Sequence, residues 1–373
     1  MATLSTEMVG KAVLCRILTG YHPFPGGPVH RLPLTAVPLL AAALLAAGCG
    51  GASDSSDATA AQGASGGDGS AAELSLVAYS TPQVVYDEII PAFAGTPEGR
   101  GVSFKTSFGA SGEQSRAVEA GLKADVVSFS IEPDVTRLVD AGLVAEDWDR
   151  TPNEGQVTTS VVSFIVRKGN PKNIRTWADL VRPGVKVLTP NPFTSGAAKW
   201  NLLAAYGQAG GGKPSQEGLD YVRELITEHV EVQDKSGREA LQTFLSGEGD
   251  VLLSYEYEAT TAQKKGEDLD YVIPADTIEI GIDIATTKDA PEQAQQFLDY
   301  VLSEPAQERF ASWGYRPVNE AVLEANADRF PIPSGLFTID DLGGWKQVDD
   351  ELFDPERGSI AKIEEEAGVS TAK

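Results

Sequence analysis

A loop of hydroxyl and glycine residues at 194–196 has the chemistry to bind an anion. Thr194, Ser195 and Gly196 separate a strand-like run at 185–188 from residues 197–206, which have the apolar stripe of a helix. The first turn of a helix has backbone N–H groups without a partner inside the helix, and the helix dipole adds positive potential there. The loop therefore predicts an anion site made of hydrogen-bond donors, with an ordinary N-cap at Thr194 or Ser195 as the alternative.

Two other segments repeat this order of strand, small polar loop and helix. Residues 107–114 lie between a strand-like run at 101–106 and a helix-like run at 113–122, and residues 74–79 lead into Ser80, Thr81 and Pro82. In open α/β sheets, ligands bind beyond the carboxyl ends of the strands. We expect the three loops to face one shared ligand.

Strand-like and helix-like runs alternate along most of the chain, which predicts an α/β fold of parallel βα units arranged as three-layer sandwiches. The long run at 157–168 predicts a crossover strand between two lobes, and residues 269–283 predict the return. We expect lobe 1 to hold residues 73–160 and 270–373, and lobe 2 to hold residues 161–269. Two such crossings would form a hinge, with the ligand cleft between the lobes. The remaining expected strands are 74–79, 102–106, 125–129, 185–188, 230–233 and 251–255, and the expected helices are 82–93, 113–122, 133–140, 197–206, 218–228, 238–245, 291–302 and 305–312.

The beginning of the chain has the form of a secretory leader. Arg31 precedes an apolar run at 32–47, and small residues then lead to Cys49, an order that resembles a bacterial lipobox. We expect residues 1–49 to be a signal peptide with a lipobox, Cys49 to carry the lipid, and residues 50–72 to be a flexible linker. The chain has two cysteines, Cys15 and Cys49, so disulfides and thiol chemistry are not available to the folded part.

The charge of the chain argues against some classes of partner. The 54 acidic and 30 basic residues give a formal charge of −24, and loss of residues 1–48 would make it −26. We therefore expect neither nucleic acid nor an anionic membrane surface as a partner. Surface charges are screened within about 10 Å, so donors in a closed cleft can still bind a small anion.

The residues offer little to an enzyme, which is one alternative function. After the leader the chain has one histidine, His229, so nucleophilic catalysis and zinc sites lack their usual groups, and we expect no metal and no cofactor. The G-A-S-G segment at 109–112 lacks the spacing of a nucleophile elbow. Glu256 and Glu258 are predicted to be surface or hinge residues at a strand end. The indoles of Trp177, Trp200 and Trp345 are predicted to pack in the core or between the lobes.

The order of motifs is similar to that of the sulfate-binding proteins of bacterial sulfate/thiosulfate ABC importers. Matching segments, which together cover nearly all of residues 74–353, are A-Y-S (78–80), G-A-S-G (109–112), R-K-G-N-P-K (167–172), T-P-N-P (189–192), K-W-N (199–201), G-D-V-L (249–252), Y-R-P (315–317), F-T-I-D (337–340) and G-G-W (343–345). The resemblance implies the two-lobed periplasmic-binding-protein fold of class II. It also implies an extracytoplasmic, lipid-anchored, monomeric receptor that delivers sulfate to permease and ATPase subunits.

The resemblance further implies which groups hold a dehydrated sulfate without any counter-charge. The implied set is the Ser80 N–H, Ser111, the Ser195 hydroxyl, the N–H groups of Gly196, Ala197 and Gly237, and Tyr255 at a position where the family often has tryptophan. A phenol can accept as well as donate a hydrogen bond, which an indole N–H cannot, so this exchange bears on the choice among oxyanions.

The chemistry of the loops favours sulfate by itself. Sulfate at neutral pH only accepts hydrogen bonds, whereas hydrogen phosphate keeps a proton and needs an acceptor. None of the candidate loop positions is acidic, although Glu113 and Glu256 are near in sequence. Six or seven hydrogen bonds of about 1.5–3 kcal/mol each suffice for micromolar binding. Thiosulfate, molybdate, tungstate or phosphate as ligand, and a structural lipoprotein without a ligand, remain as alternatives.

Overall fold

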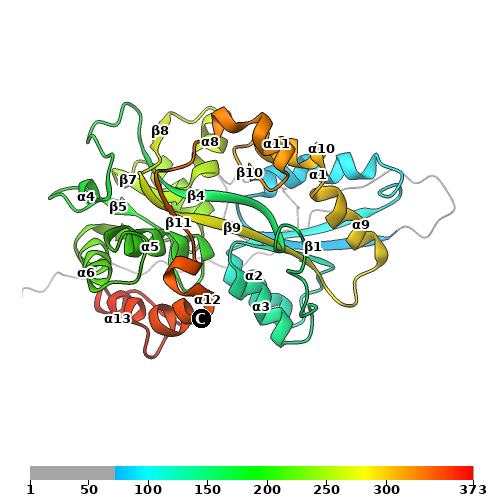
Figure 1. Ribbon diagram of the computed structural model, residues 1–373, viewed down its shortest axis with the longest axis horizontal. Coiled ribbons are helices and arrows are strands. Elements are labelled where there is room, and N and C mark those ends of the chain that lie inside the picture. The colour runs from blue at the N-terminus through cyan, green and yellow to red at the C-terminus, as the bar shows by residue number, and fades with distance from the viewer. Residues whose placement is uncertain (1–71, 373) are drawn as a thin grey trace, which may run out of the picture. The chain divides into compact units, whose positions relative to one another are not determined.

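The longest strand of the sheet, β4 (Gln156–Arg167), changes partners half-way along its length. Residues 156–161 pair with β9 (Asp276–Thr286), and residues 162–167 pair with β7 (Val251–Tyr255) and β8 (Leu269–Val272). The computed structural model describes residues 72–372, and β4 and β9 run across the middle of Figure 1. The expected signal peptide, lipobox and most of the linker lie outside the described residues.

One hydrogen-bonded path, β2-β1-β3-β9-β4-β7-β5-β6, passes through both halves of the sheet. On one side of β4 and β9 lie parallel strands β1 (Glu73–Tyr79), β2 (Ser103–Gly109) and β3 (Val126–Phe129). The helices of this half are α1 (Gln83–Ala94), α2 (Ser111–Glu119), α3 (Glu132–Asp140), α9 (Glu292–Val301) and α10 (Glu304–Ser312).

The other half contains β5 (Val187–Leu188) and β6 (Val230–Val232), which are parallel to each other, with β5 also parallel to β7. Its helices are α4 (Trp177–Leu180), α5 (Gly196–Ala209), α6 (Gln216–Glu224), the π-helix η1 (Leu225–His229), α7 (Gly237–Leu245) and α8 (Glu256–Lys264). The two-lobed α/β fold is therefore present.

The sheet is mixed, whereas the alternation of runs predicts parallel units throughout. Strand β4 is antiparallel to β7, β8 and β9, and β9 is antiparallel to β3. Strands that carry the chain between the halves enter each half from the opposite direction to its βα units, so they pair antiparallel with their neighbours.

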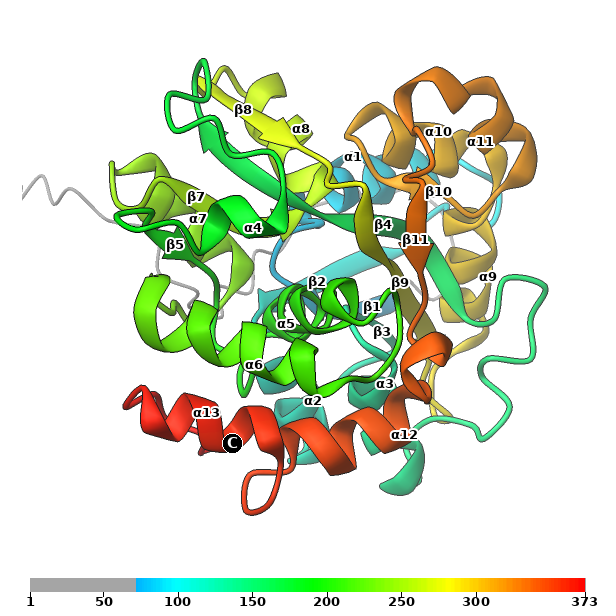
Figure 2. The same ribbon diagram turned by 60° about the vertical axis from the view of Figure 1, so that its left-hand side comes forward.

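The segment after α10 has no counterpart among the expected elements. It contains β10 (Arg316–Pro317), α11 (Glu320–Ala325), η2 (Ala327–Arg329), β11 (Gly335–Phe337), η3 (Asp340–Leu342), α12 (Gly344–Val348), η4 (Asp349–Phe353) and α13 (Ser359–Glu366). Helix α13 packs against α6, and α12 contacts α3. In Figure 2 these last helices lie along one side of α5 and α6. The Lys199 ammonium, which is almost completely buried, forms an ion pair with Asp349 and ties α5 to this segment.

Aromatic side chains fill the core under the first half of the sheet. The ring of Phe297 lies 4.7 Å from that of Phe104 and 5.3 Å from that of Phe93, within the range of favourable ring packing. Three indoles predicted to pack in the core or between the lobes are indeed buried: Trp177, Trp200 and Trp345. The Trp200 and Trp345 rings meet edge to face at 4.7 Å.

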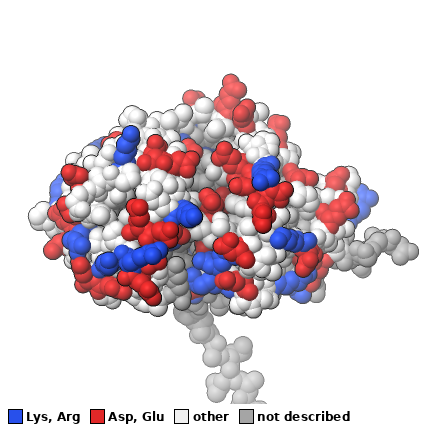
Figure 3. All heavy atoms as spheres, turned by 60° about the horizontal axis from the view of Figure 1, so that its bottom comes forward, with Lys and Arg blue, Asp and Glu red and all other residues white. Residues whose placement is uncertain are grey.

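Acidic and basic side chains are interspersed over the face of the molecule shown in Figure 3. This surface offers no broad basic area to a polyanion. Within residues 72–372, no helix combines the length and apolar character that a membrane crossing requires.

Candidate functional site

Four predicted site residues lie where helices begin. Ser111 is the first residue of α2, Gly196 of α5 and Gly237 of α7, and Tyr255 is the residue before α8. Ser80 comes two residues before Pro82, which precedes α1. Each of these positions presents first-turn N–H groups and the positive end of a helix dipole.

The start of α5 lies against the end of β3. A Cβ atom on Gly196 would be 2.2 Å from the Ser130 Oγ, so no residue with a side chain fits there without displacing Ser130. Nearby, a Cβ on Gly112 would be 3.2 Å from the Thr194 carbonyl oxygen. The glycines thus let the N-termini of α2 and α5 approach one another closely.

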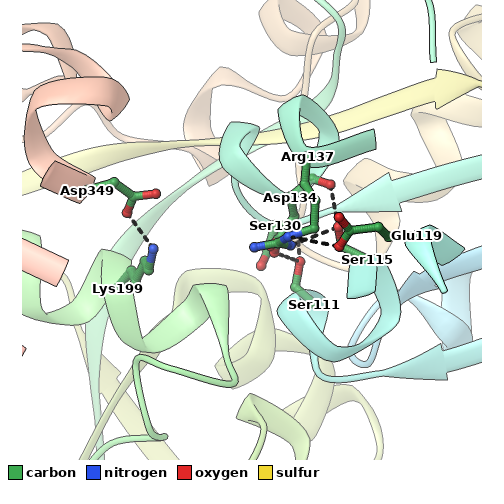
Figure 4. Close-up of polar contacts among 8 residues, drawn as sticks. All are labelled: Ser111, Ser115, Glu119, Ser130, Asp134, Arg137, Lys199 and Asp349. Atoms are coloured by element: carbon green, nitrogen blue, oxygen red, sulfur yellow. Dashed lines mark hydrogen bonds and ion pairs between the residues drawn. The ribbon is translucent and has the colours of Figure 1, made fainter. Parts of the chain in front are cut away.

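The Ser111 hydroxyl is part of a hydrogen-bonded group at the start of α2 (Figure 4). It donates to the Asp134 Oδ2 at 2.7 Å and accepts from the Ser130 N–H at 3.1 Å. The Arg137 Nη1 lies 3.0 Å from the other Asp134 oxygen and balances its charge. Because the Ser111 hydroxyl already has an acceptor, the donors that α2 offers to a ligand are its first-turn N–H groups.

The start of α7 meets both α5 and the loop after β1. The Arg238 guanidinium donates a hydrogen bond to the Ser80 carbonyl oxygen. A Cβ on Gly237 would lie 3.7 Å from the Ala197 Cβ and 3.3 Å from the Glu258 Oε2. Ser80, Ala197 and Gly237 therefore lie near one another around the start of α7.

Tyr255 brings an unsatisfied hydroxyl to the same place. Its side chain is completely buried, and its oxygen has no hydrogen-bond partner among the described residues. Burial raises the pKa of Tyr255 well above its usual value, while the nearby Ser130 hydroxyl lowers it in part. A buried hydroxyl without a partner is costly, so a ligand that accepts a hydrogen bond from this atom would offset the cost.

The structure corrects the prediction that Glu256 and Glu258 are surface or hinge residues at a strand end. Both are buried in the first turn of α8, because the helix begins directly after Tyr255. The Arg316 Nε donates to the Glu256 Oε2 at 2.7 Å. Glu258 accepts a hydrogen bond from the Ser254 hydroxyl. Burial raises the pKa of Glu258 to about 7, against the opposing effects of Ser254 and Arg238.

Sequence reasoning missed four residues of the cluster: Ser130, Asp134, Arg238 and Glu258. A signal for Ser130 was available, because it follows the end of β3 as Ser80 follows the end of β1. The other three lie within helices, and only the fold brings them to the loops.

Hydrogen bonds and ion pairs join the two halves of the molecule around this cluster. The Trp200 Nε1 donates to the Ser130 carbonyl oxygen at 2.6 Å, and the Tyr257 hydroxyl donates to that of Tyr79 at 3.0 Å. At the rim, the Lys235 ammonium lies 2.7 Å from a Glu113 oxygen. The structure therefore has the halves in contact across the site.

Within residues 72–372, no three or more histidine, cysteine or acidic side chains are placed to hold a metal ion together. His229 lies in η1, where its Nδ1 is 3.2 Å from the Val185 carbonyl oxygen.

The chain is similar to known solute-binding proteins over most of its length. Residues 74–316 match the family model described as bacterial extracellular solute-binding protein. The chain is 40% identical to a sulfate-binding protein of Synechococcus elongatus over 321 residues, which is 82% of this chain and 89% of that protein. This match decides the family. The chain belongs to the sulfate-binding proteins among the bacterial extracellular solute-binding proteins.

The chain is also similar to a solved sulfate-binding structure and to a thiosulfate-binding protein. The solved structure of the sulfate-binding protein SubI from Mycobacterium tuberculosis H37Rv is 46% identical, with a TM-score of 0.73, and the match covers 76% of this chain and all of that one. A thiosulfate-binding protein of Escherichia coli is 36% identical over 74% of this chain and 87% of its own length. Membership of this extracellular family gives the chain an extracytoplasmic location.

Proposed function

We propose that this chain binds sulfate where α2, α5, α7 and α8 begin. The observation that carries the proposal is the buried, unpartnered Tyr255 hydroxyl, which lies beside Ser130 and among helix N-termini. The Ser195 side chain makes no capping hydrogen bond to α5, so its hydroxyl is available to a ligand. The N–H groups of Gly196, Ala197 and Gly237 complete the set of donors.

The character of the donors supports sulfate over hydrogen phosphate. An anion that carries a proton needs an acceptor, and both Asp134 carboxylate oxygens already accept hydrogen bonds. The other carboxyl at the cluster is Glu258, whose pKa of about 7 leaves it largely protonated below neutral pH. Sulfate-binding relatives support the same choice, and the thiosulfate-binding relative makes thiosulfate the second candidate.

The role that follows is transport without chemistry. We infer that residues 73–160 and 270–373 form lobe 1, that residues 161–269 form lobe 2, and that closure of the lobes traps the anion. The closed form would then dock on the permease of an ABC importer, whose ATPase subunits supply the energy. The chain would act as a monomer that is held at the outer face of the membrane by lipid on Cys49.

Isothermal titration calorimetry of purified protein, freed of bound anion, tests the proposal. Sulfate, thiosulfate, molybdate and phosphate are titrated into the wild type and Ser195→Ala. We expect one sulfate per chain, with micromolar or tighter affinity, and weaker binding in the variant because a donor to a charged ligand is lost.

The exposed Ser334 provides a matched control, because Ser334→Ala removes a hydroxyl away from the cluster. Its sulfate affinity should equal that of the wild type. Tight binding of a different oxyanion with no binding of sulfate would replace the proposed ligand, and absence of binding by all four would end the proposal.

A further inference from the structure

A cavity of about 440 Å³ lies on one face of β9, the face opposite to the isoleucine side chains of that strand. Its volume is in the range of small-molecule sites. The cavity wall includes no lysine or arginine but six acidic residues: Glu132, Asp149, Glu154, Glu279, Asp283 and Asp340. None of these six belongs to the proposed anion site.

The floor of this cavity follows from the alternation of β9. The isoleucines at 278, 280, 282 and 284 are buried in the core, as expected for one face of a strand. Glu279, Gly281 and Asp283 occupy the opposite face and line the cavity. Gly281 contributes no side chain, so space remains open between the two carboxyl groups.

Asp283 is the least expected residue of this floor. It is 5% exposed, and although its backbone pairs within the sheet, its carboxyl makes no hydrogen bond or ion pair with a described residue. Two other buried aspartates differ, since Asp125 accepts from the Ser75 N–H at 2.7 Å and Asp134 pairs with Arg137. An ionised carboxyl that is so little exposed and has no protein partner is disfavoured, and either a proton or a cation in the cavity would neutralise it.

Electrostatics of the cavity point to the charge of that partner. Burial, together with the nearby Glu132, Asp134 and Asp149, raises the pKa of Asp283 well above its usual range. The pKa values of Glu132 and Glu279, which are exposed at the rim, are also raised, mainly by partial desolvation. A cation in the cavity would relieve this mutual repulsion.

Indole rings form much of the remaining wall. Trp148, Trp200 and Trp345 all line the cavity. Trp148 lies directly over Gly155, whose φ is +74° and where a Cβ would be 2.4 Å from the Trp148 ring. Gly155 therefore allows the Trp148 indole to form this side of the cavity. Aromatic rings next to carboxylates suit an ammonium group attached to carbon, because both the charge and the alkyl part find contacts.

We propose that this cavity binds a small organic cation, with an ammonium group at Asp283 and its alkyl part against the tryptophans. A metal ion is a poorer candidate, because within residues 72–372 no three acidic or histidine side chains converge at metal-binding distances. The proposal goes beyond sulfate binding and does not depend on it.

The test is calorimetry with spermidine as the probe, on the full-length protein in sulfate-free chloride buffer of fixed ionic strength. The wild type should bind one spermidine saturably. Asp283→Asn should bind it at least tenfold more weakly, with a parallel loss of the spermidine-induced change in tryptophan emission. Glu132→Gln, at the exposed rim, should weaken binding to a smaller extent, and it tests the cavity independently if Asp283→Asn fails to fold.

Asp328→Asn is the matched control, because it removes the same charge from an exposed position outside the cavity. It should bind spermidine as the wild type does. The proposal is overturned if the wild type shows no saturable binding up to about 10 mM, a concentration far above that of specific sites. It is also overturned if Asp328→Asn and Asp283→Asn weaken binding equally, since the probe would then follow net surface charge.

Discussion

The backbone of Gly196 and the hydroxyl of Ser130 come from opposite halves of the molecule and are so close that they exclude a side chain at position 196. A Cβ there would lie 2.2 Å from the Ser130 Oγ and 3.1 Å from the nearest Ile131 carbon. This contact fixes the N-terminus of α5 against the end of β3. A methyl group at position 196 would therefore have to displace the Ser130 hydroxyl or move the start of α5 away from β3.

The first prediction follows from this contact. Gly196→Ala should reduce sulfate affinity at least 100-fold, because the added methyl group displaces either Ser130 or the donors at the start of α5. If the halves remain in contact, overpacking should also lower the free energy of unfolding by about 1–3 kcal/mol. Calorimetry and urea denaturation measure the two effects.

Ser130→Ala provides the control for that variant, because it removes the atom that a methyl group at 196 would meet. The double variant should regain part of the affinity that Gly196→Ala loses. If Gly196→Ala binds sulfate as the wild type does, the close approach of the two halves has no role in binding.

The second prediction concerns the unpartnered hydroxyl of Tyr255. Without sulfate, Tyr255→Phe should leave the free energy of unfolding unchanged or raise it by about 1 kcal/mol, because a buried polar atom with no partner is removed. With sulfate, the affinity should fall about tenfold, since a hydrogen bond to a charged ligand is lost. Thermal unfolding with and without sulfate separates the two effects.

Tyr300→Phe is the control, because it removes a tyrosine hydroxyl from a ring that packs against Phe93, away from the site. It should not combine unchanged or higher stability without sulfate with weaker sulfate binding. A loss of stability in sulfate-free Tyr255→Phe would mean that the hydroxyl has a partner in the protein itself.

The third prediction concerns pH and the carboxyl of Glu258. Burial raises its pKa to about 7, and the group lies next to Gly237 at the anion site. Because the protonated form does not repel an anion, sulfate affinity should fall by about tenfold between pH 6 and pH 8.5. Glu258→Gln should bind sulfate with similar affinity at both values.

Glu320→Gln, an exposed exchange of the same kind on α11, should keep the pH dependence of the wild type. An unchanged profile in Glu258→Gln would assign the dependence to another group, and a flat wild-type profile would mean that Glu258 does not sense the ligand.

The fourth prediction concerns stability and the carboxyl of Glu364. This buried side chain accepts from the Gln233 Nε2 at 2.7 Å, while the Glu364 Oε1 and the Gln233 Oε1 have no partners. A proton on the Oε1 would let these two atoms form a second hydrogen bond. Burial raises the pKa of Glu364 to about 7, so the carboxyl is protonated in the folded protein over a range where it is ionised in the unfolded chain.

The folded protein therefore binds more protons, and the stability that Glu364 contributes is complete below about pH 4.5 and is lost as pH rises through 7. Glu364→Gln should unfold with a free energy similar to that of the wild type at pH 4.5 and higher by up to about 3 kcal/mol at pH 8. Glu365→Gln, on the exposed side of the same helix, should show no such divergence, and equal behaviour of the two variants in urea denaturation would contradict the assignment.

Local signals in the sequence located the helix starts of the site to within two residues. Ser111, Gly196 and Gly237 follow strands or small polar loops, and a helix N-terminus is determined by residues within a few positions of it. Ser130 has the same kind of signal, and attention to every strand end would have found it. The overall α/β fold was predictable for the same reason, since the runs of apolar residues have the right lengths.

Contacts between distant segments were not predictable in this way. Glu256 is buried because Arg316, sixty positions later, supplies a partner. Asp134 depends on Ser111 and Arg137, which come from two helices. The antiparallel pairing of β4 and the helices after residue 312 depend on how the two halves join, which no short window of sequence records.

A crystal structure with selenate in place of sulfate, solved with anomalous data at the selenium edge, tests the central claim most directly. The account predicts one strong selenium peak, at the centre of a selenate ion whose oxygens accept hydrogen bonds from the Ser195 hydroxyl, the N–H groups of Gly196 and Gly237, and the Tyr255 hydroxyl. A selenium peak at any other place, in a protein that calorimetry shows to bind one sulfate, would contradict it.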